Sequence, residues 1–204
     1  MSLGNPIGKD TIHLVVDMQR LFAETTAWHV PGMDRILPPI LALARAHPGE
    51  TLFTRFVTPH RPEDAVGRWR DYYRRWEEMT LSRMDPQMLD LVPALVGLAR
   101  VGSIIDKHSH GGFDEPGFAA AIDRRKASTL VVTGVETDVC VLATVFAATD
   151  RGYRAVVVAD AVTSSSATGH AAALNGVFQR LDQQIEIATA AEVLAAWPAA
   201  PSSP

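Results

Sequence analysis

Cysteine is almost absent from this chain, because Cys140 is the only one among 204 residues. A single thiol cannot form an internal disulfide, so we expect the protein to work in a reducing cytoplasm. The chain also lacks an apolar stretch near the roughly 20 residues that a membrane-spanning helix needs, and its first residues do not have the pattern of a signal peptide. These absences predict a cytoplasmic protein without a membrane partner.

An excess of positive charge is missing as well. The 19 Lys and Arg residues are outnumbered by 23 Asp and Glu residues, and no long basic run dominates, so we expect no nucleic-acid partner. A hydrophobic content of 47% with 21% charged residues is ordinary for a folded globular protein. We therefore expect one domain over residues 1–204, with flexible ends at 1–10 and 198–204.

Six short apolar runs, most of them rich in β-branched residues, are typical of strands buried in a parallel sheet. These runs occupy residues 12–16, 51–57, 103–105, 129–133, 155–159 and 185–187. Between and after them, helical spacing of apolar residues is found at 34–46, 116–125, 138–151, 167–181 and 190–197. The alternation predicts an α/β fold, a three-layer α/β/α sandwich around a six-stranded parallel sheet. The irregular segment 58–100 is too long for a simple connection and is typical of a lid-like or binding insertion.

Cys140 lies where the apolar run 129–133 gives way to a helix. The positive end of that helix should lower the pKa of the thiol, which would make it a nucleophile. Asp17 and Lys107 also follow apolar runs, and the carboxyl ends of parallel strands line one crevice, so the three residues could meet there and cleave an amide. Asp106 is a less suitable carboxylate, because strand alternation sends its side chain to the face opposite Lys107.

Several separated segments resemble the signature segments of the isochorismatase-like cysteine hydrolases, a superfamily that includes isochorismatases, nicotinamidases and N-carbamoylsarcosine amidohydrolases. The segments are 15–19 (VVDMQ) with Phe22, Lys107 with Phe113, 134–141 (GVETDVCV), and Asp160-Ala161 with Ser164 and His170. They occur in the family's order over most of the chain. The resemblance implies a Rossmann-like isochorismatase fold without a cofactor, acting on a small molecule and assembled as a homodimer or homotetramer.

The resemblance also implies the roles of individual residues. Cys140 would be the nucleophile, Asp17 would relay its proton, and Lys107 would help to hold the thiolate. A cis peptide bond between Val135 and Glu136 would turn N–H groups near Glu136 and Cys140 toward an oxyanion. The predicted activity is metal-independent cleavage of a C–N bond in a small amide, carbamoyl or ureido compound through a thioester.

The metal prediction depends on missing ligands. The nicotinamidases of this superfamily carry an Asp-x-His pair after the second strand, whereas this chain has 54–60 (TRFVTPH) there. His108 and His110, two residues apart in a loop, are more typical of surface groups than of ligands. With no third ligand in view, we predict no catalytic metal.

The candidate substrate-binding residues are an arginine and five aromatic residues: Phe22, Trp28, Arg55, Trp69, Tyr72 and Phe113. Arg55 could clamp a substrate carboxylate or carbonyl, although a structural salt bridge is an equally good interpretation. The aromatic residues could wall a pocket, or they could belong to the core or an interface. Glu136 could repel an anionic substrate, bind a cationic group or simply face solvent.

Two other functions stay open. An isochorismatase-type vinyl ether hydrolase uses acid catalysis and does not need the thiol, so the presence of Cys140 argues against it. A non-catalytic small-molecule binding or assembly protein could use the same fold, although the joint presence of Asp17, Lys107 and Cys140 opposes this interpretation.

Overall fold

The computed structural model describes residues 3–197, and six parallel strands form its single sheet in the order β3-β2-β1-β4-β5-β6. The strands are β1 (Thr11–Val16), β2 (Thr51–Phe56), β3 (Ile104–Lys107), β4 (Thr129–Val135), β5 (Arg154–Thr163) and β6 (Ile185–Ala188). The chain starts at the centre with β1, builds outward to β3, and returns to place β4 on the other side of β1. In open α/β sheets a ligand site lies beyond the carboxyl ends of the strands at such a switch point.

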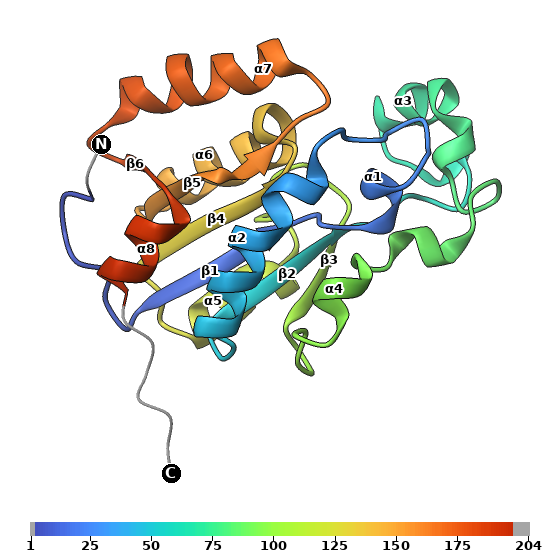
Figure 1. The fold of residues 1–204 in the computed structure, drawn as a ribbon. Helices are drawn as coiled ribbons and strands as arrows, with labels where there is room; N and C mark the ends of the chain where they lie inside the picture. The colour runs from blue at the N-terminus through green and yellow to red at the C-terminus, as the bar shows by residue number, and fades with distance from the viewer. Residues whose placement is uncertain (1–2, 198–204) are drawn as a thin grey trace.

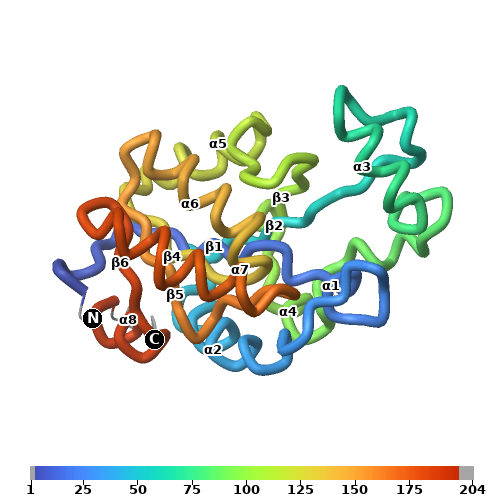
Figure 2. Tube along the Cα trace, turned by 90° about the horizontal axis from the view of Figure 1, so that it is seen from above, coloured from blue at the N-terminus to red at the C-terminus, as the bar shows by residue number. Residues whose placement is uncertain are grey.

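Helices cover both faces of the sheet, which confirms the predicted three-layer fold. Helices α2 (Met33–Ala46) and α8 (Ala190–Ala196) lie on one face, and α5 (Pro116–Arg124) and α6 (Leu142–Thr149) lie on the other (Figures 1 and 2). Each helix packs an apolar stripe on side chains that alternate along the strands. Val15 therefore belongs to the core under α2, while its neighbours Leu14 and Val16 belong to the core under α5 and α6.

The structure changes the limits of several predicted elements, including β5 and the helical run predicted for 167–181. Strand β5 continues to Thr163 instead of ending at residue 159, because its last residues pair with the end of β4, Thr163 with Val135. The helical run predicted for 167–181 is α7 (Ala167–Ala171) followed by a π-helical stretch, Ala172–Val177, and a 3₁₀ turn, Phe178–Leu181. The helical path is kept, but its hydrogen-bond spacing changes along the way.

The segment 58–100 consists of short helical pieces joined by turns. These pieces are α3 (Trp69–Arg75), α4 (Pro93–Val96) and the 3₁₀ turns Pro62–Asp64, Glu77–Met79 and Pro86–Leu89. The part around α3 extends away from the three-layer body (Figures 1 and 2). Gln19 ties the later part of this segment to the end of β2. Its side-chain amide donates to Leu89 O at 2.9 Å and accepts from Phe56 N at 2.7 Å. The short helix α1 (Arg20–Ala23) follows Gln19 directly.

We expected residues 1–10 to form a flexible end. Residues 1–2 lie outside the described residues, and residues 3–10 contact the body of the protein. Ile7 is buried and donates its N–H to Ala196 O, and the Arg154 guanidinium donates to the carbonyl groups of Asn5 and Pro6. The other expected flexible end, 198–204, lies outside the described residues. Within residues 3–197, no helix combines the length and apolar character needed to cross a bilayer.

Candidate active site

A buried ion pair lies at the carboxyl ends of β1 and β3. Lys107 Nζ is 2.8 Å from Asp17 Oδ2, and both side chains are 0% exposed. The hydroxyl of Thr54, near the end of β2, donates to Asp17 Oδ1 at 2.6 Å, and Lys107 Nζ also donates to Ser109 O at 3.0 Å. Burial is the largest single effect and lowers the pKa of Lys107, but Asp17 and Cys140 together outweigh it, so the pKa of Lys107 is raised.

The backbone brings the ends of β1 and β4 unusually close at this point. Gly134 has a φ of +107°, and a Cβ atom there would overlap the carbonyl oxygen of Val16. Asp17, the next residue after Val16, has a φ of +51°, a value that non-glycine residues seldom adopt. This conformation turns the Asp17 carboxylate into the sheet edge beside the turn that carries Cys140.

Cys140 is positioned in a π-helical turn, Thr137–Val141, that leads into α6. Asp17 and Lys107 both lie near enough to its thiol to shift the pKa of that thiol. Burial raises the pKa of the thiol, Lys107 opposes this effect, and the Asp17 carboxylate adds to it. The expectation of a lowered thiol pKa is therefore wrong, because desolvation outweighs the nearby positive charge.

The turn before Cys140 contains the cis peptide bond Val135-Glu136. Glu136 O accepts hydrogen bonds from Val139 N at 3.1 Å and Val141 N at 3.0 Å, which closes the turn tightly.

Side chains from the end of β5 and from α7 support this turn from outside. Ser164 Oγ donates to Asp138 Oδ1 at 2.6 Å, and His170 Nδ1 lies 2.9 Å from Thr137 Oγ1. His170 therefore supports the turn that carries Cys140.

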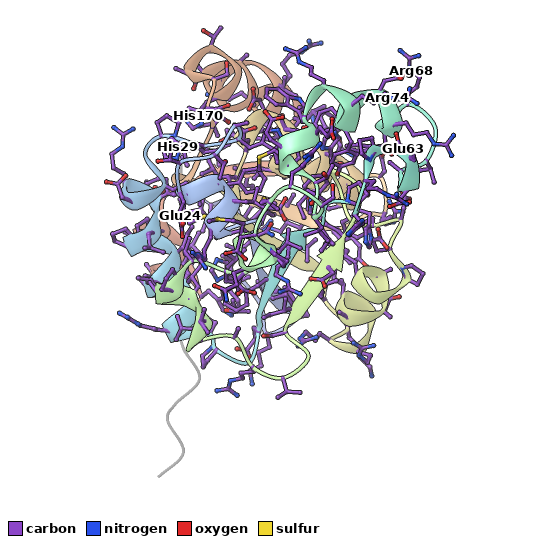
Figure 3. All side chains as sticks on the ribbon, turned by 90° about the vertical axis from the view of Figure 1, so that its right-hand side faces the viewer. Glu24, His29, Glu63, Arg68, Arg74 and His170 are labelled. Atoms are coloured by element: carbon purple, nitrogen blue, oxygen red, sulfur yellow. The ribbon has the colours of Figure 1, made fainter. Side chains whose placement is uncertain are left out.

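A cavity of about 310 Å³ opens above Cys140. Its lining residues are Phe22, Ala27, Trp28, His29, Phe56, Tyr72, Trp76, His110, Glu136, Val139, Cys140 and Ser165. Figure 3 views the molecule from this edge of the sheet, with the labelled His29 on one side and the labelled Arg68 and Arg74 of the α3 region on the other. Three of the six residues predicted to bind substrate, Phe22, Trp28 and Tyr72, line the cavity.

The other three predicted substrate residues do not line it. Arg55 forms a two-point salt bridge with Asp106, at 2.7 and 2.9 Å, because the two residues are register partners on the opposite face of β2 and β3. Trp69 stands behind the cavity wall with its ring 4.8 Å from that of His110. Phe113 is buried in the core, 4.7 Å from Phe118 between ring centroids.

His110 is the main residue that sequence reasoning missed. Its Nδ1 atom lies 3.9 Å from Cys140 Sγ, and its ring stacks on Phe56 at 6.3 Å between centroids. Burial and the Lys107 charge lower the pKa of His110, so its imidazole is neutral near pH 7. His110 is partly buried and lines the cavity, and its place three residues after Lys107 was the one signal in the sequence for this position.

The described part of the chain, residues 3–197, contains no group of three or more His, Cys, Asp or Glu side chains placed to hold a metal ion. The segment that begins at the end of β2, where the nicotinamidases of the superfamily carry their Asp-x-His pair, has Arg55, Val57 and His60 in a different pattern. The donor set of a metal-dependent relative is therefore not present there.

The fold and the site together define a class of protein: an α/β enzyme scaffold with a buried cysteine, aspartate and lysine at the switch point of a parallel sheet. The Isochorismatase domain family matches residues 11–191, and the chain belongs to this family of hydrolases. The resemblance inferred from the sequence segments is thereby confirmed.

Several solved structures are similar to this chain in fold. A cysteine hydrolase from Pseudomonas syringae pv. phaseolicola 1448A is similar over 96% of this chain and 98% of its own, with 26% identity and a TM-score of 0.77. An isochorismatase family protein from Burkholderia thailandensis is similar over 94% of this chain and 97% of its own, at 24% identity and a TM-score of 0.73. A pyrazinamidase of Pyrococcus horikoshii in complex with zinc shares the fold at 22% identity, with a TM-score of 0.68 over 88% of this chain and 99% of its own.

Proposed function

We propose that the protein is a metal-independent cysteine hydrolase that cleaves a C–N bond in a small amide, carbamoyl or ureido compound. The observation that carries the proposal is the position of the Cys140 thiol at the floor of a cavity, within reach of the buried Asp17–Lys107 pair. A thiol, a carboxylate that can take its proton and a fixed cation are the groups that covalent amide hydrolysis needs.

Charge conservation explains how a thiol with a raised pKa can react. If the Cys140 proton moves to Asp17, the site changes from a thiol beside a carboxylate–ammonium pair to a thiolate and ammonium beside a carboxylic acid. The total charge stays the same, so no uncompensated charge is created in the buried site. Lys107 is close enough to stabilise either anion.

The reaction then follows in two halves. The thiolate attacks the carbonyl carbon, and the C–N bond breaks as Asp17 returns the proton to the leaving nitrogen, which departs as ammonia or an amine. Water next attacks the thioester while Asp17 accepts one of its protons, and the C–S bond breaks to release the acid and restore the thiol. The N–H groups near Glu136 and Cys140 are the proposed donors to the oxyanion in both halves.

Metal independence is part of the proposal and is supported by the residues after β2. Neither Arg55 nor Val57 is a usual ligand for a divalent metal, and His60 alone cannot hold one. We also propose that the segment 58–100 acts as the lid-like part of the site, because it supplies Tyr72 and Trp76 to the cavity wall.

The test is release of ammonia or amine from a panel of small primary amides, carbamoyl amines and ureides, in buffer that contains a chelator. We expect the wild type to turn over at least one compound, with activity lost in Cys140→Ala and Asp17→Asn. Asp106→Asn is the matched control, because it removes an exposed carboxylate next to Lys107 on the other face of β3 and should stay active.

Two results would contradict the proposal. Turnover that survives Cys140→Ala, in particular on a vinyl ether such as isochorismate, would favour acid-catalysed ether hydrolysis. Turnover that disappears with chelator and returns with zinc would refute metal independence.

A further inference from the structure

The cavity above Cys140 has walls made mostly of aromatic rings. Trp28 stands at the centre of this wall, with the centroids of its neighbours 5.8 to 6.4 Å away. The neighbouring rings are Phe22 at 6.3 Å, Phe56 at 6.0 Å, Tyr72 at 5.8 Å and Trp76 at 6.4 Å. All five of these side chains line the cavity, so a bound molecule meets π surfaces on several sides.

The same cavity holds one carboxylate and no ammonium or guanidinium group. Glu136 is the only acidic residue among its lining residues, and no Lys or Arg is among them. Glu136 Oε1 accepts from Ser165 N at 2.8 Å, and within residues 3–197 Glu136 forms no ion pair. Its negative charge is therefore held at the cavity wall without a counter-ion.

The positively charged side chains near the cavity already form ion pairs with other residues. Lys107 is paired with Asp17 at 2.8 Å below the floor, and Arg55 is turned to Asp106 on the far face. His110 adds no charge near neutral pH, because burial and Lys107 lower its pKa.

Two basic side chains stand at the outer edge. His29 is exposed and binds Glu24 O through Nδ1 at 3.0 Å (Figure 3). Arg75 is exposed and lies over the Trp76 ring at 5.2 Å, outside the set of lining residues. A guanidinium already on one side of Trp76 indicates that this ring can hold a cation.

We propose that the substrate is a small amide, carbamoyl or ureido compound that carries a positive charge, an ammonium or quaternary ammonium group, next to the reacting carbonyl. The charged group would lie among the Trp28, Tyr72 and Trp76 rings, with Glu136 as its counter-ion. Rings attract cations through their negative faces, and a carboxylate without an ion-pair partner at the cavity wall adds to that attraction. The same carboxylate should repel substrates that carry a carboxylate of their own.

The inference rests on the proposed function for the identity of the reacting group, but the charge preference can be measured without turnover. The probes are 2-(trimethylammonio)acetamide and its neutral isostere 3,3-dimethylbutanamide, which differ by one atom and one charge. Calorimetry on Cys140→Ala measures their binding in the absence of chemistry. We expect the cationic probe to bind about tenfold more tightly or better, and the difference to shrink at high salt.

Glu136→Gln isolates the charge, because the glutamine carbonyl can still accept the hydrogen bond from Ser165 N. In the Cys140→Ala background it should bring the two probes to within about threefold of each other. Glu63→Gln is the matched control, since Glu63 carries the same charge on the segment 58–100, lines a different surface hollow, and should leave the ratio unchanged. Arg75→Gln should strengthen binding of the cationic probe, because it removes a competing positive charge near Trp76.

Several outcomes would overturn the inference. These are equal or tighter binding of the neutral probe, a preference for the anionic probe succinamate, no cation binding in the millimolar range, or an unchanged ratio in Glu136→Gln. If Cys140→Ala prefers the cation but the wild type hydrolyses no amide, the proposed function fails while the charge preference stands. If neutral or anionic amides are the ones hydrolysed, the charge preference fails while the proposed function stands.

Discussion

Breaking the buried ion pair between Asp17 and Lys107 should strongly destabilise the protein, whereas removing both charges together should not. Both side chains are 0% exposed, and their charged atoms are 2.8 Å apart. Lys107→Met leaves a buried carboxylate with the Thr54 hydroxyl as its remaining side-chain partner at 2.6 Å. A buried charge that loses its partner costs about 3–5 kcal/mol, a large share of the roughly 5–15 kcal/mol that holds a typical protein folded.

Asp17→Asn leaves the opposite problem, an ammonium group that retains Ser109 O at 3.0 Å and the Phe56 ring at 4.9 Å. We expect a loss near the lower end of the same range, about 3 kcal/mol, because the asparagine oxygen can still accept a hydrogen bond. The double variant Asp17→Asn/Lys107→Met leaves no unpaired charge, so it should return to within about 1–2 kcal/mol of the wild type. The coupling energy between the two sites should therefore be about 4 kcal/mol or more.

Urea denaturation followed by tryptophan fluorescence gives the free energy of unfolding of each variant. The exposed pair Arg55–Asp106 is the control, with side chains 26% and 44% exposed, and disrupting it should cost about 1 kcal/mol or less. All three Asp17 and Lys107 variants should be inactive, so the double variant separates stability from catalysis. A loss below about 1 kcal/mol in either single variant, or losses that simply add in the double variant, would refute the reasoning.

Two further predictions concern protonation. Burial lowers the pKa of His13 to about 3, from an ordinary 6.5, with a smaller effect from His47. Below pH 6.5 His13 takes up a proton in the unfolded chain but stays neutral in the folded protein, which favours unfolding. The free energy of unfolding should therefore be at its full value above pH 6.5 and should fall by about 2–3 kcal/mol between pH 7 and pH 4.5. Urea denaturation at the two pH values should show a smaller fall in His13→Gln, and an equal fall in both proteins would contradict the assignment. For the Cys140 thiol, whose pKa burial raises above an ordinary 9.0, alkylation by iodoacetamide without substrate should keep accelerating above pH 9, and a plateau below pH 8 would show that the free thiol is already ionised.

The sequence was sufficient to predict the sheet and the three catalytic candidates. Each strand is a short apolar run between polar boundaries, so its existence depends on neighbouring residues in the chain. Asp17, Lys107 and Cys140 each lie at or just beyond the end of such a run, and parallel strands place their carboxyl ends at one edge of the sheet. Strand alternation also predicted correctly that the side chains of Asp106 and Lys107 point to opposite faces, since Asp106 is exposed and Lys107 is buried.

The choice of substrate-binding residues would have been better if we had known which residues of β2 and β3 pair side by side in the sheet. The register pairs Phe56 with Lys107 and Arg55 with Asp106. Because register partners share a face, Phe56 lies on the side of Lys107 and lines the cavity, while Arg55 lies with Asp106 on the other side. Register depends on the pairing of two distant segments, which a single run of residues does not contain.

The sequence by itself determined the order of strands and helices and the identity of the groups that the fold brings to one edge. Only the tertiary structure decided which aromatic residues face the cavity, that His110 joins Cys140, and that the thiol pKa is raised rather than lowered. The physical reason is that secondary structure follows from local spacing, whereas a pKa and a cavity wall depend on how much water distant segments exclude.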